Sequence, residues 1–248
     1  MATAGLEMAT AKDPDVLGTP AGAFKLCFLC VRDLVSNGRL GWYIWQSRRV
    51  VGWTRGEEAA LLAKTALNLP DSASIVEVGS FLGCSTILLA GARAVGGSGR
   101  VHSVDTFLNS GDELSKPVYD AIAASCDTSV LDGFIRNLIR AGVRDLVEIH
   151  VGESSGVATR WNTPIDLLVL DGDQSCDGVQ GAFHSWSPWL KPGGFVALHN
   201  AEPSYRVAGH DGHARLAESL LASEDFDLAG CAATLFVFRR LTGRATGR

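Results

Sequence analysis

The amino-acid sequence predicts a Rossmann-like, doubly wound α/β fold, in which helices cover both faces of a mostly parallel seven-stranded sheet that ends in a C-terminal antiparallel hairpin. From residue 74 onward, short apolar runs alternate with helical segments, which is typical of parallel strands joined by crossover helices. Glycine or acidic residues follow several of these runs, where open α/β sheets bind ligands. The 248 residues, 46% of them hydrophobic, can build one large core.

The ordered part of the chain is predicted to be a single domain, residues 21–241. Residues 1–20 show no hydrophobic periodicity and are expected to form a disordered tail, and residues 242–248 a frayed end. Residues 21–70 are expected to form a helical cover.

Within this cover, the spacing of apolar residues predicts a helix over residues 21–46, interrupted at Gly38 and Gly41. A second helix is predicted over residues 57–67, with Thr54 as its N-cap.

The remaining elements follow in alternation. Strands are predicted at residues 74–78, 100–105, 146–151, 165–171, 194–199, 226–230 and 234–239. Helices between them are predicted at residues 85–95, 118–141 and 176–190. The last two strands are expected to form the hairpin at the edge of the sheet.

Charge and composition exclude several classes of partner. A formal net charge of −5 offers no general attraction for nucleic acid or for anionic membrane surfaces. The sequence shows neither a signal peptide nor a membrane-spanning run, so we expect a cytoplasmic protein. The six cysteines are expected to be reduced, and Cys27 and Cys30 are interpreted as small buried helix residues rather than zinc or redox ligands.

A glycine-rich turn follows the first strand, with the pattern Glu77-x-Gly79-Ser80-x-x-Gly83 before a helix that starts near Ser85. Such a turn lets the backbone approach a ligand, although glycine also marks ordinary strand-to-helix turns. The second strand ends in Asp105, where a Rossmann-like site holds the ribose hydroxyls of an adenosine, with a loop-capping role as the alternative. Ser154, after the third strand, is expected to lie along the adenine.

These segments also carry a resemblance to a known family. The residues concerned are Glu77-Val78-Gly79-Ser80 with Gly83 and Ser85-Thr86, then Val104-Asp105, then residues 166–173, then Lys191-Pro192-Gly193-Gly194. In this order they resemble the motifs of class I S-adenosylmethionine-dependent methyltransferases, and most closely those of bacterial small-molecule O-methyltransferases acting on sugars and antibiotics. The likeness covers residues 52–239.

The resemblance implies that S-adenosylmethionine is the cofactor. Glu77 is then expected near the methionine or ribose, while Gly79 and Gly83 line the cofactor and Asp105 holds the ribose. The full expected cofactor-binding set is Glu77, Gly79, Ser80, Gly83, Ser85, Asp105, Ser154 and Asp171. An NAD-dependent oxidoreductase is a weaker alternative, because the E-x-G-x-x-x-G spacing differs from the G-x-G-x-x-G turn that admits a pyrophosphate.

Polar residues at the ends of two later strands indicate where the reaction takes place. Asp171 and Asp173 follow one predicted strand and His199-Asn200 the next, at the same edge of a parallel sheet. Resemblance to metal-dependent O-methyltransferases, catechol O-methyltransferase among them, implies magnesium bound by Asp171, Asp173 and Asn200. The ion lowers the pKa of the acceptor hydroxyl.

Two positions depart from that resemblance. Gln174 stands where such bacterial enzymes often have a histidine, and Asn200 where they often have an aspartate. The expected catalytic residues are therefore His199, as general base, with Asp171 and Asp173, and His199 packed structurally beneath a loop is the alternative. The loop histidines His210 and His213 are further titratable candidates.

The acceptor is expected to lie between two long loops, residues 106–117 and 201–214, whose polar content suits a small hydroxylated molecule such as a sugar. Solvated surface loops are the alternative. The aromatic residues Trp42, Tyr43, Trp45 and Trp53 are expected to pack in the core, to cover the pocket or to form a subunit contact in a homodimer.

The leading hypothesis is thus an O-methyltransferase. A catalytically silent protein that binds S-adenosylmethionine is the alternative, motivated by Gln174 and Asn200.

Overall fold

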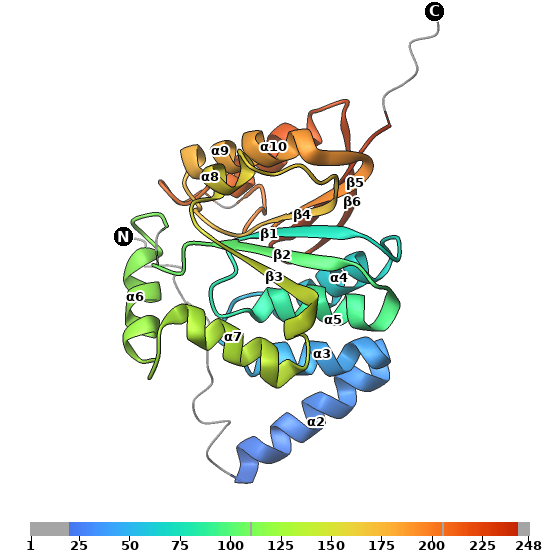
Figure 1. Cartoon of the computed structure of the whole chain (residues 1–248), viewed down its shortest axis with the longest axis vertical. Coiled ribbons are helices and arrows are strands. Elements are labelled where there is room, and N and C mark those ends of the chain that lie inside the picture. Colours follow the sequence, from blue (N-terminus) through green and yellow to red (C-terminus); the bar gives the residue numbers. More distant parts are fainter. Residues whose placement is uncertain (1–19, 110, 205, 243–248) are drawn as a thin grey trace, which may run out of the picture.

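The computed structural model describes residues 20–109, 111–204 and 206–242 (Figure 1). The predicted tails therefore lie almost entirely outside the described residues, as do Ser110 and Tyr205 of the two predicted acceptor loops. No helix in the described ranges is long and apolar enough to cross a bilayer.

A seven-stranded sheet forms the centre of the molecule, as the sequence predicts. Its strands are β1 (Ser74–Val78), β2 (Arg100–Asp105), β3 (Val147–Val151), β4 (Ile165–Leu170), β5 (Leu190–Leu198), β6 (Phe226–Ala232) and β7 (Leu235–Arg240). Their order is β3-β2-β1-β4-β5-β7-β6. Strands β1 to β5 pair in parallel, and β7 pairs antiparallel with both β5 and β6, which confirms the C-terminal hairpin.

Helices cover both faces of the sheet (Figure 1). Alternate strand residues point to opposite faces, so Ile75 and Leu167 pack with the N-terminal helices, while Val76 and Leu168 pack on the other side. Strands β1 and β4 are buried along their whole length, which explains why their sequences are apolar apart from Ser74, Glu77 and Asp166.

The first face carries α3 (Arg39–Arg48), α4 (Gly56–Leu67), α5 (Cys84–Gly96) and α7 (Val130–Ala141), with α2 (Pro20–Asn37) outside them (Figure 1). The predicted break at Gly38 is confirmed, and its φ of +56° explains it. The predicted break at Gly41 is wrong, because this residue lies inside α3, where a side chain would collide with the carbonyl oxygen of Asp33 in α2. The predicted N-cap of α4 is wrong, because Arg55 rather than Thr54 occupies that position.

The segment over residues 118–141, predicted as one helix, is two. They are α6 (Lys116–Ala124) and α7, which starts at a new cap where the Ser129 hydroxyl accepts a hydrogen bond from the Asp132 amide at 3.1 Å. The prediction for Cys27 is also wrong, because this residue is exposed and Cys30 is only partly covered.

The second face carries α8 (Ser154–Ala158), α9 (Cys176–Trp186) and α10 (Gly212–Leu221). Sequence reasoning missed α8 and α10. Helix α10 begins inside the segment predicted as the second acceptor loop, so that loop ends at Asp211. Short 3-10 turns precede β3 and follow α9, at Arg144–Leu146 and Ser187–Trp189.

Candidate active site

A cavity of about 500 Å³ lies at the carboxyl ends of β1, β2, β3 and β4. The strand order reverses between β1 and β4, and open α/β sheets bind their ligands at such a switch point. Four segments that follow these strands line the cavity: residues 78–81, 104–107, 152–155 and 170–173. The volume is in the range that holds a molecule of nucleoside size.

The glycine turn after β1 brings two strand ends into contact. Gly79 has a φ of +89°, and a Cβ atom there would lie 2.5 Å from the carbonyl oxygen of Asp171 and from the Cα of Gly172. Glycine is therefore required for contact between the ends of β1 and β4, and this contact shapes the floor of the cavity.

Asp105 fastens the same turn to β2. Its Oδ2 accepts hydrogen bonds from the amides of Ser80 and Phe81, both at 2.8 Å, and its Oδ1 accepts one from the Phe107 amide at 2.7 Å. An ionised carboxylate offers about four acceptor positions, so one remains for a ligand in the cavity.

Glu77 lies fully buried beneath the turn. Its Oε2 accepts hydrogen bonds from the Ser80 hydroxyl at 2.8 Å and the Thr86 hydroxyl at 2.5 Å. Burial raises the pKa of Glu77 to about 7, although the hydroxyl groups around it oppose the shift. The residue holds the turn and the start of α5 together from inside.

The predicted cofactor-binding residues are brought together at this place. Those that line the cavity are Gly79, Ser80, Ser85, Asp105, Ser154 and Asp171. Glu77 and Gly83 are not among the lining residues: Glu77 is buried below the turn, and Gly83 caps the start of α5 and faces Phe134. Ser154 accepts a hydrogen bond from the Trp186 indole at 2.8 Å.

His199 lies behind the cavity, between two carboxylates. Its Nδ1 is 2.9 Å from Asp171 Oδ1, and its Nε2 is 3.5 Å from Glu58 Oε2. Burial disfavours the charged ring, yet the two carboxylates raise the pKa of His199 to about 10. The arrangement favours a charged imidazole that positions Asp171, while the role of His199 as general base stays a prediction.

The three expected magnesium ligands fit that ion poorly. Asp171 faces the imidazole of His199, and Asp173 Oδ1 accepts a hydrogen bond from the Ser175 amide at 2.8 Å, at the start of α9. Asn200 does not line the cavity, and its Oδ1 lies 3.5 Å from the Thr234 hydroxyl. A cation beside Asp171 meets the charged ring of His199, so a magnesium requirement stays a prediction that this donor set does not favour.

Gln174 and His213 form a pair that sequence reasoning did not foresee. His213 is buried, lines the cavity and has its Nδ1 2.7 Å from Gln174 Oε1. An amide oxygen only accepts, so Nδ1 carries the proton and Nε2 keeps its lone pair. Burial, together with the positive charges of other histidines, lowers the pKa of His213 to about 3, so its ring is neutral at pH 7.

The two predicted acceptor loops meet beside the cavity. His210 Nδ1 lies 3.0 Å from Asp112 Oδ1, which joins the second loop to the first. Trp53 also lines the cavity, and its ring packs against Phe81 and Tyr119, with centroids 6.1 Å and 5.1 Å away. The cavity therefore has one polar wall and one aromatic wall.

Comparisons with known proteins agree with this geometry. A family model described as a methyltransferase domain matches residues 76–201. The O-methyltransferase TomG from Streptomyces achromogenes, involved in tomaymycin synthesis and solved in complex with S-adenosylmethionine, is 22% identical. The match covers 84% of this chain and 91% of TomG, with a TM-score of 0.57.

An O-methyltransferase from Bacillus cereus, solved in complex with S-adenosylhomocysteine, is 16% identical. This match covers 92% of this chain and 94% of the Bacillus chain, with a TM-score of 0.56. At these identities the two likenesses establish a shared fold.

Proposed function

Because the chain belongs to the family of methyltransferase domains, we propose that it transfers the methyl group of S-adenosylmethionine to an oxygen atom of a small hydroxylated acceptor, such as a sugar or a glycosylated metabolite. The observation that carries this proposal is the single cavity region in which the glycine turn, Asp105 and the pair Asp171 and Asp173 meet. The ligands and activities named for TomG and the Bacillus enzyme support the choice of donor and of oxygen as the acceptor atom.

In this proposal the donor lies along the ends of β1, β2 and β3. Asp105 accepts a hydrogen bond from a ribose hydroxyl at its remaining acceptor position, and Ser154 lies along the adenine. Residues 78–81 and Asp171 face the methionine part, whose sulfonium carries a positive charge that nearby carboxylates stabilise.

The acceptor hydroxyl lies beside Asp171, Asp173 and His213. The methyl group passes from the sulfonium sulfur to the acceptor oxygen, the sulfur keeps the electron pair of the broken bond, and the hydroxyl proton moves to the Asp173 carboxylate. Nε2 of His213 is an acceptor that can orient the hydroxyl. We assign no part of this step to magnesium, because the donor set around Asp171 does not favour the ion.

A methyl-transfer assay with a panel of hydroxylated acceptors tests the proposal. Asp173→Asn is expected to lower kcat about a hundredfold, because general-base catalysis typically contributes at least that factor. The KM for S-adenosylmethionine should stay the same. The matched control is Asp145→Asn, at an exposed aspartate that does not line the cavity.

Two outcomes decide between the alternatives. Binding of S-adenosylmethionine without transfer to any acceptor would support the catalytically silent protein and contradict the proposal. Activity that disappears with EDTA and returns with magnesium would show that the ion is required after all.

We also propose that the chain forms a homodimer through α2. Phe28, Val31 and Val35 lie at positions i, i+3 and i+7 of this helix and are 61%, 55% and 81% exposed. A contiguous apolar stripe of this kind on a helix usually marks a protein contact.

The cytoplasm is the proposed location, which agrees with free cysteines throughout the described residues.

A further inference from the structure

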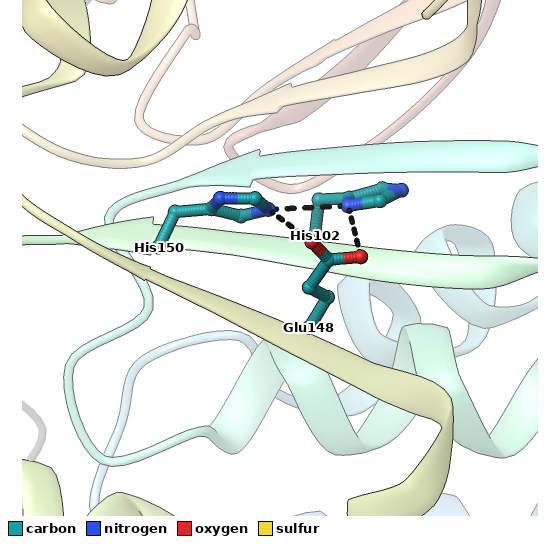
Figure 2. A group of neighbouring side chains, drawn as sticks. All are labelled: His102, Glu148 and His150. Carbon is teal, nitrogen blue, oxygen red and sulfur yellow. Dashed lines mark hydrogen bonds and ion pairs between the residues drawn. The ribbon is translucent and has the colours of Figure 1, made fainter.

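Three metal-ligating side chains meet on the sheet beside its β3 edge. His102 belongs to β2, and Glu148 and His150 belong to β3, two residues apart and so on the same face. The register places His102 opposite Glu148 and Val104 opposite His150, so all three side chains share that face. Figure 2 shows the two imidazole rings and the carboxylate turned toward one another.

The distances between the donor atoms match those of a tetrahedral metal site. His102 Nδ1 and His150 Nε2 are 3.2 Å apart, and Glu148 places Oε2 3.5 Å from the first and Oε1 3.6 Å from the second (Figure 2). Zinc bonds of about 2.0–2.2 Å in a tetrahedron place two ligand atoms about 3.3–3.6 Å apart. The two imidazole nitrogens are therefore separated by nearly this distance, and the Glu148 carboxylate places a different oxygen at this distance from each of them. With one ligand atom taken from each residue, the three atoms lie within 4.8 Å of one another.

We propose that His102, Glu148 and His150 bind a divalent zinc ion. Two imidazoles and one carboxylate are a common zinc donor set, and a water molecule takes the fourth position. Magnesium is disfavoured because it prefers oxygen ligands. No other three histidine, cysteine or acidic residues in the described parts of the chain bring their candidate ligand atoms within 4.8 Å of one another.

The surroundings keep the donors available. Burial lowers the pKa of His102. The Trp161 indole packs edge-on against both rings, with centroids 4.8 Å and 5.7 Å away, and holds their orientation. The Glu148 side chain is 55% exposed, which leaves the ion a way in from solvent. The positive charge of Arg100 opposes a cation here, but the negative charge of the Glu148 carboxylate acts on His102 more strongly and in the opposite sense.

The ion would fasten the edge strand β3 to β2. None of its three ligands lines the cavity, so the site is separate from the proposed reaction. His102 nevertheless lies three residues before Asp105, and the Gly152 amide after β3 donates to the Asp105 carbonyl at 2.9 Å. The metal therefore stabilises the two strands that carry this side of the cavity.

Calorimetric titration of the reduced, metal-free protein with zinc chloride tests the proposal. The wild type should show one saturable site that excess magnesium does not occupy. Glu148→Gln and His150→Gln should each weaken zinc binding at least tenfold, because each removes one of three protein ligands. Both positions are partly exposed, so both variants should melt at the wild-type temperature in zinc-free buffer.

Two control variants distinguish zinc binding at this site from zinc binding at other histidines or cysteines of the chain. His184→Gln removes an exposed histidine on α9, and Cys27→Ser with Cys30→Ser removes the C-x-x-C pair on α2. Both control proteins should keep the site with wild-type affinity. The absence of saturable binding in the wild type, or binding that survives His150→Gln and disappears in the cysteine variant, would overturn the proposal. Neither result bears on methyl transfer.

Discussion

At the scale of single residues, His213 lies in surroundings that strongly disfavour a positive charge on its ring. It is buried against the cavity, and its Nδ1 is committed to Gln174. Protonation of the ring would place a second hydrogen on Nε2 and a positive charge in a region where His199 is already charged. The folded protein therefore holds His213 neutral, with a lone pair left on Nε2.

This predicts a specific loss of stability in acid. The pKa of His213 is about 3 in the folded state and near its ordinary 6.5 in the unfolded state. Between these values the unfolded chain binds the extra proton, so the free energy of unfolding falls as the pH falls, by up to about 1.4 kcal/mol per pH unit. Above pH 6.5 the residue contributes no slope.

Urea denaturation of the wild type and of His213→Gln between pH 4 and pH 7 measures the effect. The variant should show the shallower dependence on pH, even if it is less stable at pH 7. His184→Gln, at an exposed histidine, serves as control and should follow the wild type. Equal slopes in wild type and His213→Gln would show that the folded protein tolerates a charged ring at this position.

At the scale of elements, the turn between β1 and α5 is held by a contact that only glycine allows. Gly79→Ala adds both the strain of a left-handed conformation and a collision with Asp171 and Gly172. Gly142→Ala is a matched control, because Gly142 caps α7 with a φ of +73° and has open space where a Cβ would lie.

Chemical denaturation should separate the two effects. Gly142→Ala is expected to cost roughly 1–2 kcal/mol, the strain of one left-handed residue. Gly79→Ala should cost clearly more and should also weaken binding of S-adenosylmethionine, because the ends of β1 and β4 must move apart. Equal costs in the two variants would mean that the contact between the two strand ends adds nothing.

The strands were predictable because burial leaves a plain signal in the sequence. Strands β1 and β4 read as short apolar runs bounded by turns, and both fall within one residue of prediction. Helix boundaries were harder. The polar segment of residues 125–129 is too short to interrupt the hydrophobic periodicity. The break between α6 and α7 therefore depends on the cap at Ser129.

The candidate site was predictable only where residues follow neighbouring strands. Gly79, Asp105 and Asp171 stand at strand ends, and parallel topology alone brings them together. Gln174 and His213 are 39 positions apart and meet because α10 packs on α9, a contact that no local pattern encodes. The cluster of His102, Glu148 and His150 depends in the same way on the register between β2 and β3.

At the scale of the whole molecule, the exposed stripe on α2 predicts self-association. Sedimentation of the wild type should give a dimer, since burying this stripe removes apolar surface from water. Phe28→Asp combined with Val35→Asp should shift the equilibrium to monomer without changing the far-ultraviolet circular dichroism. A wild type that stays monomeric at micromolar concentration would contradict the prediction.

The proposed function requires that the ends of several strands together form one cofactor site. Cofactor binding by the whole molecule is therefore its most direct test. Calorimetric titration with S-adenosylhomocysteine measures this without knowledge of the acceptor. We predict one site per chain, with affinity reduced at least tenfold in Asp105→Ala, which loses both the ribose acceptor and the anchor of the turn. Absence of binding by the wild type, or full affinity in Asp105→Ala, would contradict the account.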